Sequence, residues 1–371
     1  MGDSRIFQSV NHRIVISAAW ALIALMIVLF ATGPVGAQTQ ASTLQPAGPV
    51  AEMQSNVFWL VFWIGVGIFT TVIGLLFYVI VRYRSRRGDE KRVPKQTEGS
   101  VALEIAWTIV PVILVIIIAV PTVQGIFALS KPPEDAETLS VTVIGHQWWW
   151  EFQYPEYGIV TANELHIPVG KVIDVTLISN DVIHSFWVPN LAGKMDVNPY
   201  RPDPLPNSVN KMWFQADKPG IYFGQCAEFC GLNHALMRFR VVAHEPEDFE
   251  AWLEGREALA TAAYQPMTAE EEEYAGHAEL VNKGRELFSR YCLGCHSIDG
   301  AGFPFGGTLG PNLTQIGSRL TIAAGILDNT PENLAAWLRN PEAIKPGTLM
   351  STLRLSDDEV EALVAFLHSQ K

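Results

Sequence analysis

Four side chains that favour soft metal ions lie within twelve residues of this chain. The thiols of Cys226 and Cys230 are followed by the imidazole of His234 and the thioether of Met237. Thiolate, imidazole and thioether ligands together are typical of copper sites. A blue-copper site uses one thiolate, whereas the two thiolates available here suit two copper ions. A local disulfide would leave His234 and Met237 without a role, and zinc would leave Met237 without one. The stretch favours copper, with zinc and a disulfide as alternatives.

A second cluster lies near the C-terminus, at Cys292-Leu-Gly-Cys295-His296. Two cysteines two residues apart and an adjacent histidine form the attachment signature of c-type haem, in which the histidine ligates iron. A redox disulfide or half of a zinc site would not require the adjacent His296. Met350 is the only methionine after Met267, and methionine is a common ligand opposite the histidine. We therefore predict a covalent haem with Met350 as the sixth ligand.

Length, charge and cysteine usage narrow the class of protein. The chain has 371 residues, a formal net charge of −12 and four cysteines, all of them in the two motifs. The length allows two or three domains, and no cysteine pair remains for a structural disulfide framework. Seven Lys or Arg residues fall between Arg82 and Lys95, so acidic residues dominate elsewhere. This asymmetry indicates a membrane topology and argues against nucleic-acid binding.

The N-terminal region has the features of an export signal. An apolar run from Val15 to Thr32 follows basic residues, and small residues precede Gln38. We predict a signal peptide cleaved after Ala37, although an uncleaved membrane helix is the alternative because the run is long.

Two further apolar segments are long enough to cross a bilayer. They extend from Val57 to Val81 and, with flanking residues, from Ile105 to Val120. Because short cytoplasmic loops are rich in Lys and Arg, the basic run between the segments is placed inside and everything after about Gln124 outside. Glu104 stands at the cytoplasmic end of the second span, where it is either a functional carboxylate or a solvated interfacial charge.

The region after the membrane spans changes to a β pattern. Short segments rich in Val, Ile, Phe and Trp alternate with turns, which predicts an all-β sandwich or barrel. His184 lies at the end of one such segment and could supply a further nitrogen ligand to the cysteine loop. The predicted strands are Leu139–Gly145, Glu164–Pro168, Val172–Ser179, Lys211–Ala216, Ile221–Gly224 and Arg238–Val242.

The C-terminal part is predicted to be an acidic linker followed by a small helical domain. Eleven acidic residues and one basic residue lie between Glu245 and Glu279, so we predict a solvated, partly helical linker. Lys283–Tyr291 leads into the haem motif as an amphipathic helix. Thr330-Pro331 and the capping box at Ser356 mark the starts of two more.

The motifs together resemble subunit II of haem–copper cytochrome c oxidase. The resemblance covers about Ser55 to Ala243 and is carried by Gly145–Trp150, His184–Pro189 and Cys226–Met237. For this region it implies a transmembrane hairpin of two α-helices and an all-β cupredoxin-like domain. The segment Lys345–Met350 resembles the ligand loop of class I cytochromes c, which adds an all-α cytochrome c domain to this multidomain fold. The predicted boundaries are a signal peptide at 1–37, a spacer at 38–54, the hairpin at 55–131, the copper domain at 132–243, the linker at 244–279 and the cytochrome domain at 280–371.

The resemblance also implies the ligands of a dinuclear copper (CuA) centre. Cys226 and Cys230 would bridge both copper ions. His184 and Met237 would bind one copper, and His234 and the Glu228 carbonyl the other. The Glu228 side chain would help to hold a magnesium ion shared with the catalytic subunit.

Two residue roles outside the copper ligands follow from the same resemblance. Trp148 matches the aromatic residue through which electrons reach the copper, although aromatic packing would also explain it. Glu104 matches a glutamate at the mouth of a proton pathway.

The expected function is to bring electrons into a terminal respiratory oxidase of the bacterial plasma membrane. Electrons would pass from a soluble or membrane-bound donor to haem c, then to the copper, and then to a separate subunit I that reduces oxygen. The expected partners are subunit I, other oxidase subunits and membrane lipid. The alternatives are the copper subunit of a nitric oxide reductase and a membrane-anchored copper carrier. Quinol oxidases are disfavoured because their copper domain is expected to lack the ligand cysteines.

Overall fold

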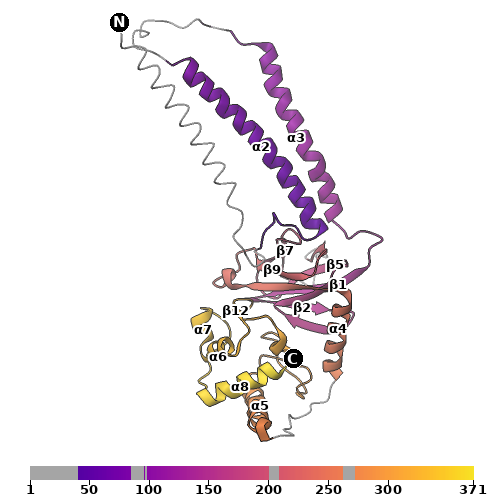
Figure 1. The fold of residues 1–371 in the computed structure, drawn as a ribbon, viewed down its shortest axis with the longest axis vertical. Coiled ribbons are helices and arrows are strands. Elements are labelled where there is room, and N and C mark those ends of the chain that lie inside the picture. Colours follow the sequence, from indigo (N-terminus) through magenta and orange to yellow (C-terminus); the bar gives the residue numbers. More distant parts are fainter. Residues whose placement is uncertain (1–40, 85–95, 97, 200–208, 262–271) are drawn as a thin grey trace, which may run out of the picture. The chain divides into compact units, whose positions relative to one another are not determined.

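The computed structural model describes residues 41–84, 96, 98–199, 209–261 and 272–371 (Figure 1). The predicted signal peptide lies outside these residues, as does most of the basic run. Residues Ala41–Lys371 form one compact unit.

Two long apolar helices, α2 (Pro49–Arg82) and α3 (Val101–Leu129), are the two candidate membrane spans among the described residues. Helix α2 has 34 residues and is therefore about 51 Å long at 1.5 Å per residue. This exceeds the ~30 Å hydrocarbon thickness. Its first turns pack on the β-domain, where Val50, Ala51 and Ser55 are buried. The helix therefore begins earlier than the apolar run predicts.

The β-domain consists of two five-stranded sheets. The first has the order β3-β2-β1-β5-β8 and the second has the order β4-β10-β9-β6-β7. The strands are β1 (Thr138–His146), β2 (Trp149–Tyr154), β3 (Ile159–Ala162), β4 (Glu164–Pro168), β5 (Val172–Ser179), β6 (His184–Trp187), β7 (Met195–Val197), β8 (Asn210–Phe214), β9 (Gly220–Cys226) and β10 (Arg238–His244).

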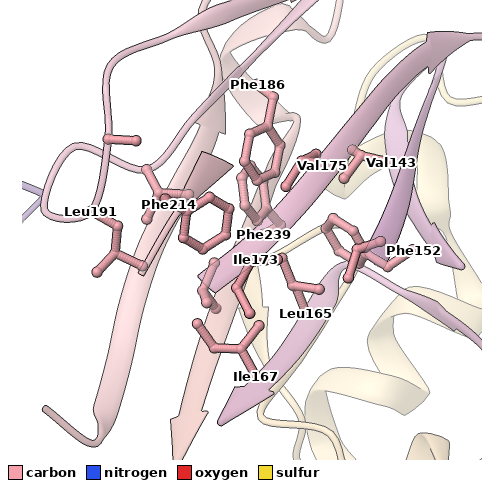
Figure 2. Close-up of a cluster of buried hydrophobic side chains, with 14 of the residues drawn as sticks. Val143, Phe152, Leu165, Ile167, Ile173, Val175, Phe186, Leu191, Phe214 and Phe239 are labelled. Atoms are coloured by element: carbon pink, nitrogen blue, oxygen red, sulfur yellow. The ribbon is translucent and has the colours of Figure 1, made fainter. Parts of the chain in front are cut away.

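The core between the sheets follows from the alternation of buried and less buried residues along the strands. In β1, for example, Leu139, Val141 and Val143 are buried while their neighbours are less so. Aromatic residues from both sheets meet at the centre, where the ring of Phe152 in the first sheet lies 5.7 Å, centroid to centroid, from that of Phe239 in the second (Figure 2). Such a close-packed core gives rigid support to the loops at the strand ends.

The sequence predicts β4 and β5 with their observed bounds and places β1, β8, β9 and β10 to within a few residues. It misses β2, β3, β6 and β7. Three of these four have at most four residues, which is too short for a clear alternation.

The predicted linker is helical over α4 (Pro246–Thr261), as expected, but one face of this helix is buried and not solvated. Phe249 and Leu253 are buried in the core of the β-domain, and Arg256, the linker's one basic residue, is buried as well. Arg256 Nη2 donates a hydrogen bond of 2.7 Å to the Val160 carbonyl. Although this helix is rich in acidic residues, one of its faces is apolar and packs on the β-domain.

The C-terminal part is helical, as predicted. It contains α5 (Glu272–Tyr291), α6 (Pro331–Arg339), α7 (Pro341–Ile344), α8 (Asp357–Ser369), the 3-10 turn η2 (Ile316–Ser318) and a small hairpin, β11 (Thr321–Ile322) and β12 (Leu327–Asp328). Helices α5 and α8 cross closely at Gly284, where a Cβ atom would lie 1.9 Å from the Ala362 carbonyl oxygen. The predicted capping box at Ser356 begins α8.

Candidate copper and haem sites

The copper-ligand candidates lie at the ends of three strands of one sheet. His184 begins β6, Cys226 ends β9, and Met237 directly precedes β10. Pairing of β6 with β9 and of β9 with β10 brings these ends together. The loop after Cys226 contributes Cys230, and the 3-10 turn η1 (His234–Leu236) contributes His234.

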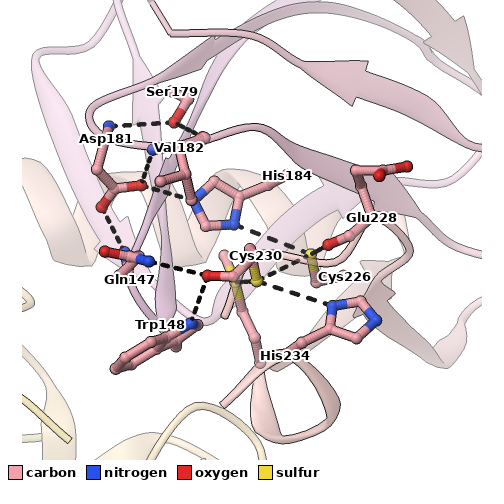
Figure 3. A network of polar contacts seen from close by, with 11 residues as sticks. Gln147, Trp148, Ser179, Asp181, Val182, His184, Cys226, Glu228, Cys230 and His234 are labelled. Carbon is pink, nitrogen blue, oxygen red and sulfur yellow. Dashed lines mark hydrogen bonds and ion pairs between the residues drawn. The ribbon is translucent and has the colours of Figure 1, made fainter. Parts of the chain in front are cut away.

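The structure brings the six predicted copper residues into one cluster. Figure 3 shows His184, Cys226, Glu228, Cys230 and His234. The two Sγ atoms are 3.7 Å apart, whereas a disulfide requires about 2.05 Å. Cys226 Sγ lies 3.9 Å from His184 Nδ1 and 3.2 Å from the Glu228 carbonyl oxygen. Cys230 Sγ lies 3.7 Å from His234 Nδ1 and 3.9 Å from Met237 Sδ. A backbone carbonyl therefore joins five side-chain donors.

Burial and charge make this donor set suitable for a soft metal ion. Cys226, Cys230, His184 and Met237 are each at most 5% exposed. The hydrogen bond from Cys230 lowers the pKa of Cys226 to about 3, while the neighbouring sulfur raises the pKa of Cys230. Two thiols this close resist double ionisation unless a cation lies between them. The residues fit a copper centre.

Asp181 orients His184 and was missed by the sequence reasoning. Its Oδ1 lies 2.8 Å from His184 Nε2, and its Oδ2 accepts a hydrogen bond of 2.6 Å from the Gln147 backbone N–H. Because a carboxylate only accepts, His184 donates through Nε2, and in the neutral imidazole Nδ1 is then the free nitrogen facing Cys226. The spacing of three residues between Asp181 and His184 is the one sequence signal that could have found it.

The three consecutive tryptophans have separate surroundings. Trp148 Nε1 donates to the Cys230 carbonyl at 3.0 Å, and Gln147 Nε2 donates to the same oxygen at 2.8 Å. Trp149 stacks on His146 with centroids 4.1 Å apart, and Trp150 is fully buried in the core. Trp148 thus has a direct hydrogen bond to the cysteine loop, whereas the Trp150 ring lies edge-on to His184, with centroids 5.9 Å apart.

Replacing Asp181 by Asn is expected to weaken copper binding by about 10- to 100-fold, the usual effect of losing a residue that supports a metal-ligating histidine. The amide keeps the size but removes the negative charge that faces the His184 N–H. Competition against a copper chelator would measure the affinity. Asp135→Asn, in an exposed turn before β1, is the matched control. Equal affinities for the two variants would contradict the role of Asp181.

The haem motif follows the end of α5, where Cys292 is buried and Cys295 is exposed. His296 Nδ1 lies 2.8 Å from the Pro311 carbonyl oxygen. Since a carbonyl only accepts, Nδ1 carries the proton and Nε2 is left to bind a metal. Gly310 allows this arrangement, because a Cβ atom there would lie 2.5 Å from His296 Cε1. These residues fit a haem held by Cys292, Cys295 and His296.

Met350 and Glu104 have different surroundings, and Met350 packs against the same hydrophobic cluster that contains Cys292. Met350 is partly buried against the hydrophobic core of the C-terminal helices, between α7 and α8. Glu104 is exposed in the first turn of α3.

Three family models match successive parts of the chain. The model for cytochrome c oxidase subunit II, transmembrane domain, matches residues 37–124. The model for cytochrome c oxidase subunit II, periplasmic domain, matches residues 158–244, and the model for cytochrome c matches residues 281–371.

Full-length relatives match as well. Cytochrome c oxidase subunit 2 of Alkalihalophilus pseudofirmus is 38% identical over 351 residues, covering 93% of this chain and 95% of that protein. The subunit of the same name from Bacillus sp. strain PS3 is 37% identical over 345 residues, covering 89% and 91%. A crystal structure of the periplasmic domain of subunit II of cytochrome oxidase from Bradyrhizobium japonicum is 33% identical, covers 34% of this chain and 95% of that chain, and has a TM-score of 0.30.

Proposed function

The chain belongs to the family of cytochrome c oxidase subunit II, and from this membership we propose that it carries electrons from an external donor, by way of haem c and CuA, to the subunit that reduces oxygen to water. Membership makes the chain part of an oxidoreductase complex with a catalytic subunit I and other oxidase subunits. It is a membrane-anchored protein with an extracytoplasmic domain.

The observation that carries the proposal is the convergence of His184, Cys226, Glu228, Cys230, His234 and Met237 on one point. When bound, two copper ions would share one electron between them. The protein's part is to hold the ligands still, because a site that does not move exchanges electrons with little reorganisation. The strand ends and the Asp181–His184 hydrogen bond supply that rigidity. The depth of the donors also argues against a copper carrier with a labile site.

Further roles belong to the same proposal. Trp148 is proposed as the residue through which electrons approach the copper, supported by its hydrogen bond to the Cys230 carbonyl. The exposed Glu228 points its carbonyl toward Cys226 and its carboxylate away (Figure 3). That carboxylate is proposed to bind a magnesium ion at the boundary with subunit I. Glu104 is proposed to serve proton uptake, and Met350 to ligate the haem iron.

The setting is proposed to be the bacterial plasma membrane, with α2 and α3 in contact with lipid. Their apolar side chains are exposed along most of both helices, as expected for lipid-facing surfaces. The donor is proposed to be a soluble or membrane-bound redox protein.

Purification of the complex containing this chain would test the function. With a reduced donor, we expect oxygen consumption that depends on both copper and haem in this chain. Nitric oxide consumption without oxygen consumption would instead identify the nitric oxide reductase alternative. Neither activity in a complex loaded with copper and haem would refute the proposal.

A further inference from the structure

The haem-bearing part of the chain contacts the β-domain through two buried polar groups. The first is Glu164, at the start of β4, which is 3% exposed. Its Oε1 accepts hydrogen bonds from the backbone N–H groups of Leu320, at 2.7 Å, and Thr321, at 3.1 Å. Leu320 directly precedes the β11–β12 hairpin of the haem-bearing part, and Thr321 is the first residue of β11. A buried carboxylate of one domain is thus satisfied by N–H groups of the other.

Positive charges surround this carboxylate from both sides. Burial raises the pKa of Glu164, and the charges of Arg319 and Arg240 oppose that rise. Arg319 comes from the haem-bearing part and donates to the Thr314 carbonyl at 3.2 Å. Arg240 comes from β10 and donates across the boundary to the Gly325 carbonyl at 3.2 Å. Arg240 and His166, whose Nε2 lies 3.8 Å from Glu164 Oε2, belong to the β-domain itself. The N–H groups of Leu320 and Thr321 and the charge of Arg319 reach Glu164 only while the two parts are in contact.

The hairpin itself continues this contact. Near its tip, the Ala324 carbonyl accepts a hydrogen bond of 3.0 Å from the Arg238 backbone N–H at the start of β10. Ala324 is also buried in a small apolar cluster with Trp149 and Ala162 of the β-domain. Linked domains move relative to one another by default, and the backbone hydrogen bond and apolar burial at Ala324 oppose that motion.

The second buried group is Lys345, 4% exposed, which directly follows α7. Its Nζ donates a hydrogen bond of 2.6 Å to the Trp148 carbonyl, and the Trp148 indole in turn donates to the Cys230 carbonyl. Two residues later, Gly347 has a φ of 81° and lies against the cysteine loop, where a Cβ atom would be 2.4 Å from Leu232 Cδ2. The segment that leads to Met350 therefore lies directly on the copper loop.

We propose that Glu164 and Lys345 lock the haem-bearing part onto the copper-bearing sheet, so that electrons cross from haem to copper at one fixed geometry and not through encounters of a tethered domain. This inference rests on the proposed function, because it assumes that electrons pass from the haem to the copper. Separation of the two parts would leave the Glu164 carboxylate without the N–H groups of Leu320 and Thr321, and the Lys345 amine without the Trp148 carbonyl. Both are positioning residues, acting through Leu320, Thr321 and Trp148.

The test uses the complete oxidase complex with full-length variants. Glu164→Gln removes the charge and keeps the shape, Glu164→Ala removes the acceptor, and Lys345→Met removes the donor. Glu156→Gln and Lys283→Met, at exposed sites of the β-domain and of α5, are the matched controls. Light-triggered reduction of the haem, followed by the absorbance of haem and copper over time, measures the haem-to-copper rate at low and high ionic strength. Hydrogen exchange across residues 319–327 and 345–348 reports undocking.

For the unaltered chain and both controls, we expect one haem-to-copper rate that salt does not change, because buried contacts are little screened. Glu164→Ala and Lys345→Met should slow it by about tenfold or more, as loss of a hydrogen bond to a buried charged group implies. Glu164→Gln should slow it less, and the slowed rates should become salt-dependent. Hydrogen exchange should rise in the two segments, while the haem spectrum and copper signal stay unchanged.

Two results would overturn the lock. One is an unaltered rate and unaltered hydrogen exchange in all three variants with both metals bound. The other is a haem-to-copper rate in the unaltered chain that already changes with salt. Failure of the proposed function would look different, because copper would then stay oxidised after haem reduction in the unaltered chain. Hydrogen exchange would still decide the lock in that case.

Discussion

Replacing Cys230 by Ser is expected to abolish the dinuclear copper signal and the oxidase activity that depends on it. Cys230 Sγ is the centre of the cluster, facing Cys226, His234 and Met237 at 3.7, 3.7 and 3.9 Å. Serine keeps the size but replaces a soft thiolate by a hard, protonated oxygen that is a poor copper ligand. The remaining donors no longer offer two bridging sulfur atoms.

The loss should be large. Mutation of residues that only support metal ligands already lowers metal affinity by about 10- to 100-fold. Removal of a bridging ligand should therefore lower copper affinity by about 100-fold or more. Electron paramagnetic resonance of the copper-loaded complex measures the outcome. The unaltered chain should give a mixed-valence dinuclear signal beside a low-spin haem, and the variant a single-copper signal or none.

The haem in the same chain is the internal control. Its spectrum should be unchanged in Cys230→Ser, because the haem is held by a different set of residues. A variant with a normal dinuclear signal would show that Cys230 does not bridge the coppers. A single-copper signal in the unaltered chain would contradict the whole copper assignment.

The comparison between sequence and structure shows where local patterns are informative. The soft donors of the cysteine loop are close in sequence, so their chemistry could be read directly from Cys226 to Met237. His184 is 42 residues from Cys226, and only its place at a strand end together with the family resemblance pointed to it. The pairing of β6 with β9 is the physical reason that the two meet.

Supporting residues were harder to predict because their roles depend on partners far away in the chain. Gln147 and Trp148 donate to Cys230 from more than 80 residues away, at separations of 83 and 82. Glu164 looks like an ordinary strand residue until Leu320 and Thr321, separated from it by 156 and 157 residues, are seen to donate to it. A one-dimensional pattern contains no signal for a contact between two domains.

The buried face of the predicted linker was also not apparent from the sequence pattern. Eleven acidic residues predicted a solvated, partly helical linker, yet helix α4 buries Phe249 and Leu253 in the core of the β-domain. Composition averages over the two faces of a helix, whereas burial depends on one face only.

Met350→Ala is expected to lower the reduction potential of the haem without releasing it. Cys292 and Cys295 would still attach the haem and His296 would still face it, held by the Pro311 carbonyl. A methionine ligand raises the potential of a haem. Its loss should therefore shift the potential down by on the order of 0.1 V or more, part of the roughly 0.8 V range that axial ligands span.

A redox titration followed by visible absorbance would measure both the potential and the change of ligand. Leu349→Ala is the matched control, because Leu349 is the adjacent residue and is 75% exposed. An unchanged spectrum in Met350→Ala would assign the sixth ligand to another residue. Since Lys345 and Gly347 fix the start of the same segment on the copper loop, Met350→Ala should leave hydrogen exchange at residues 345–348 unchanged. Lys345→Met should raise that exchange and leave the potential unchanged, so the two variants separate the tuning of the haem from its placement.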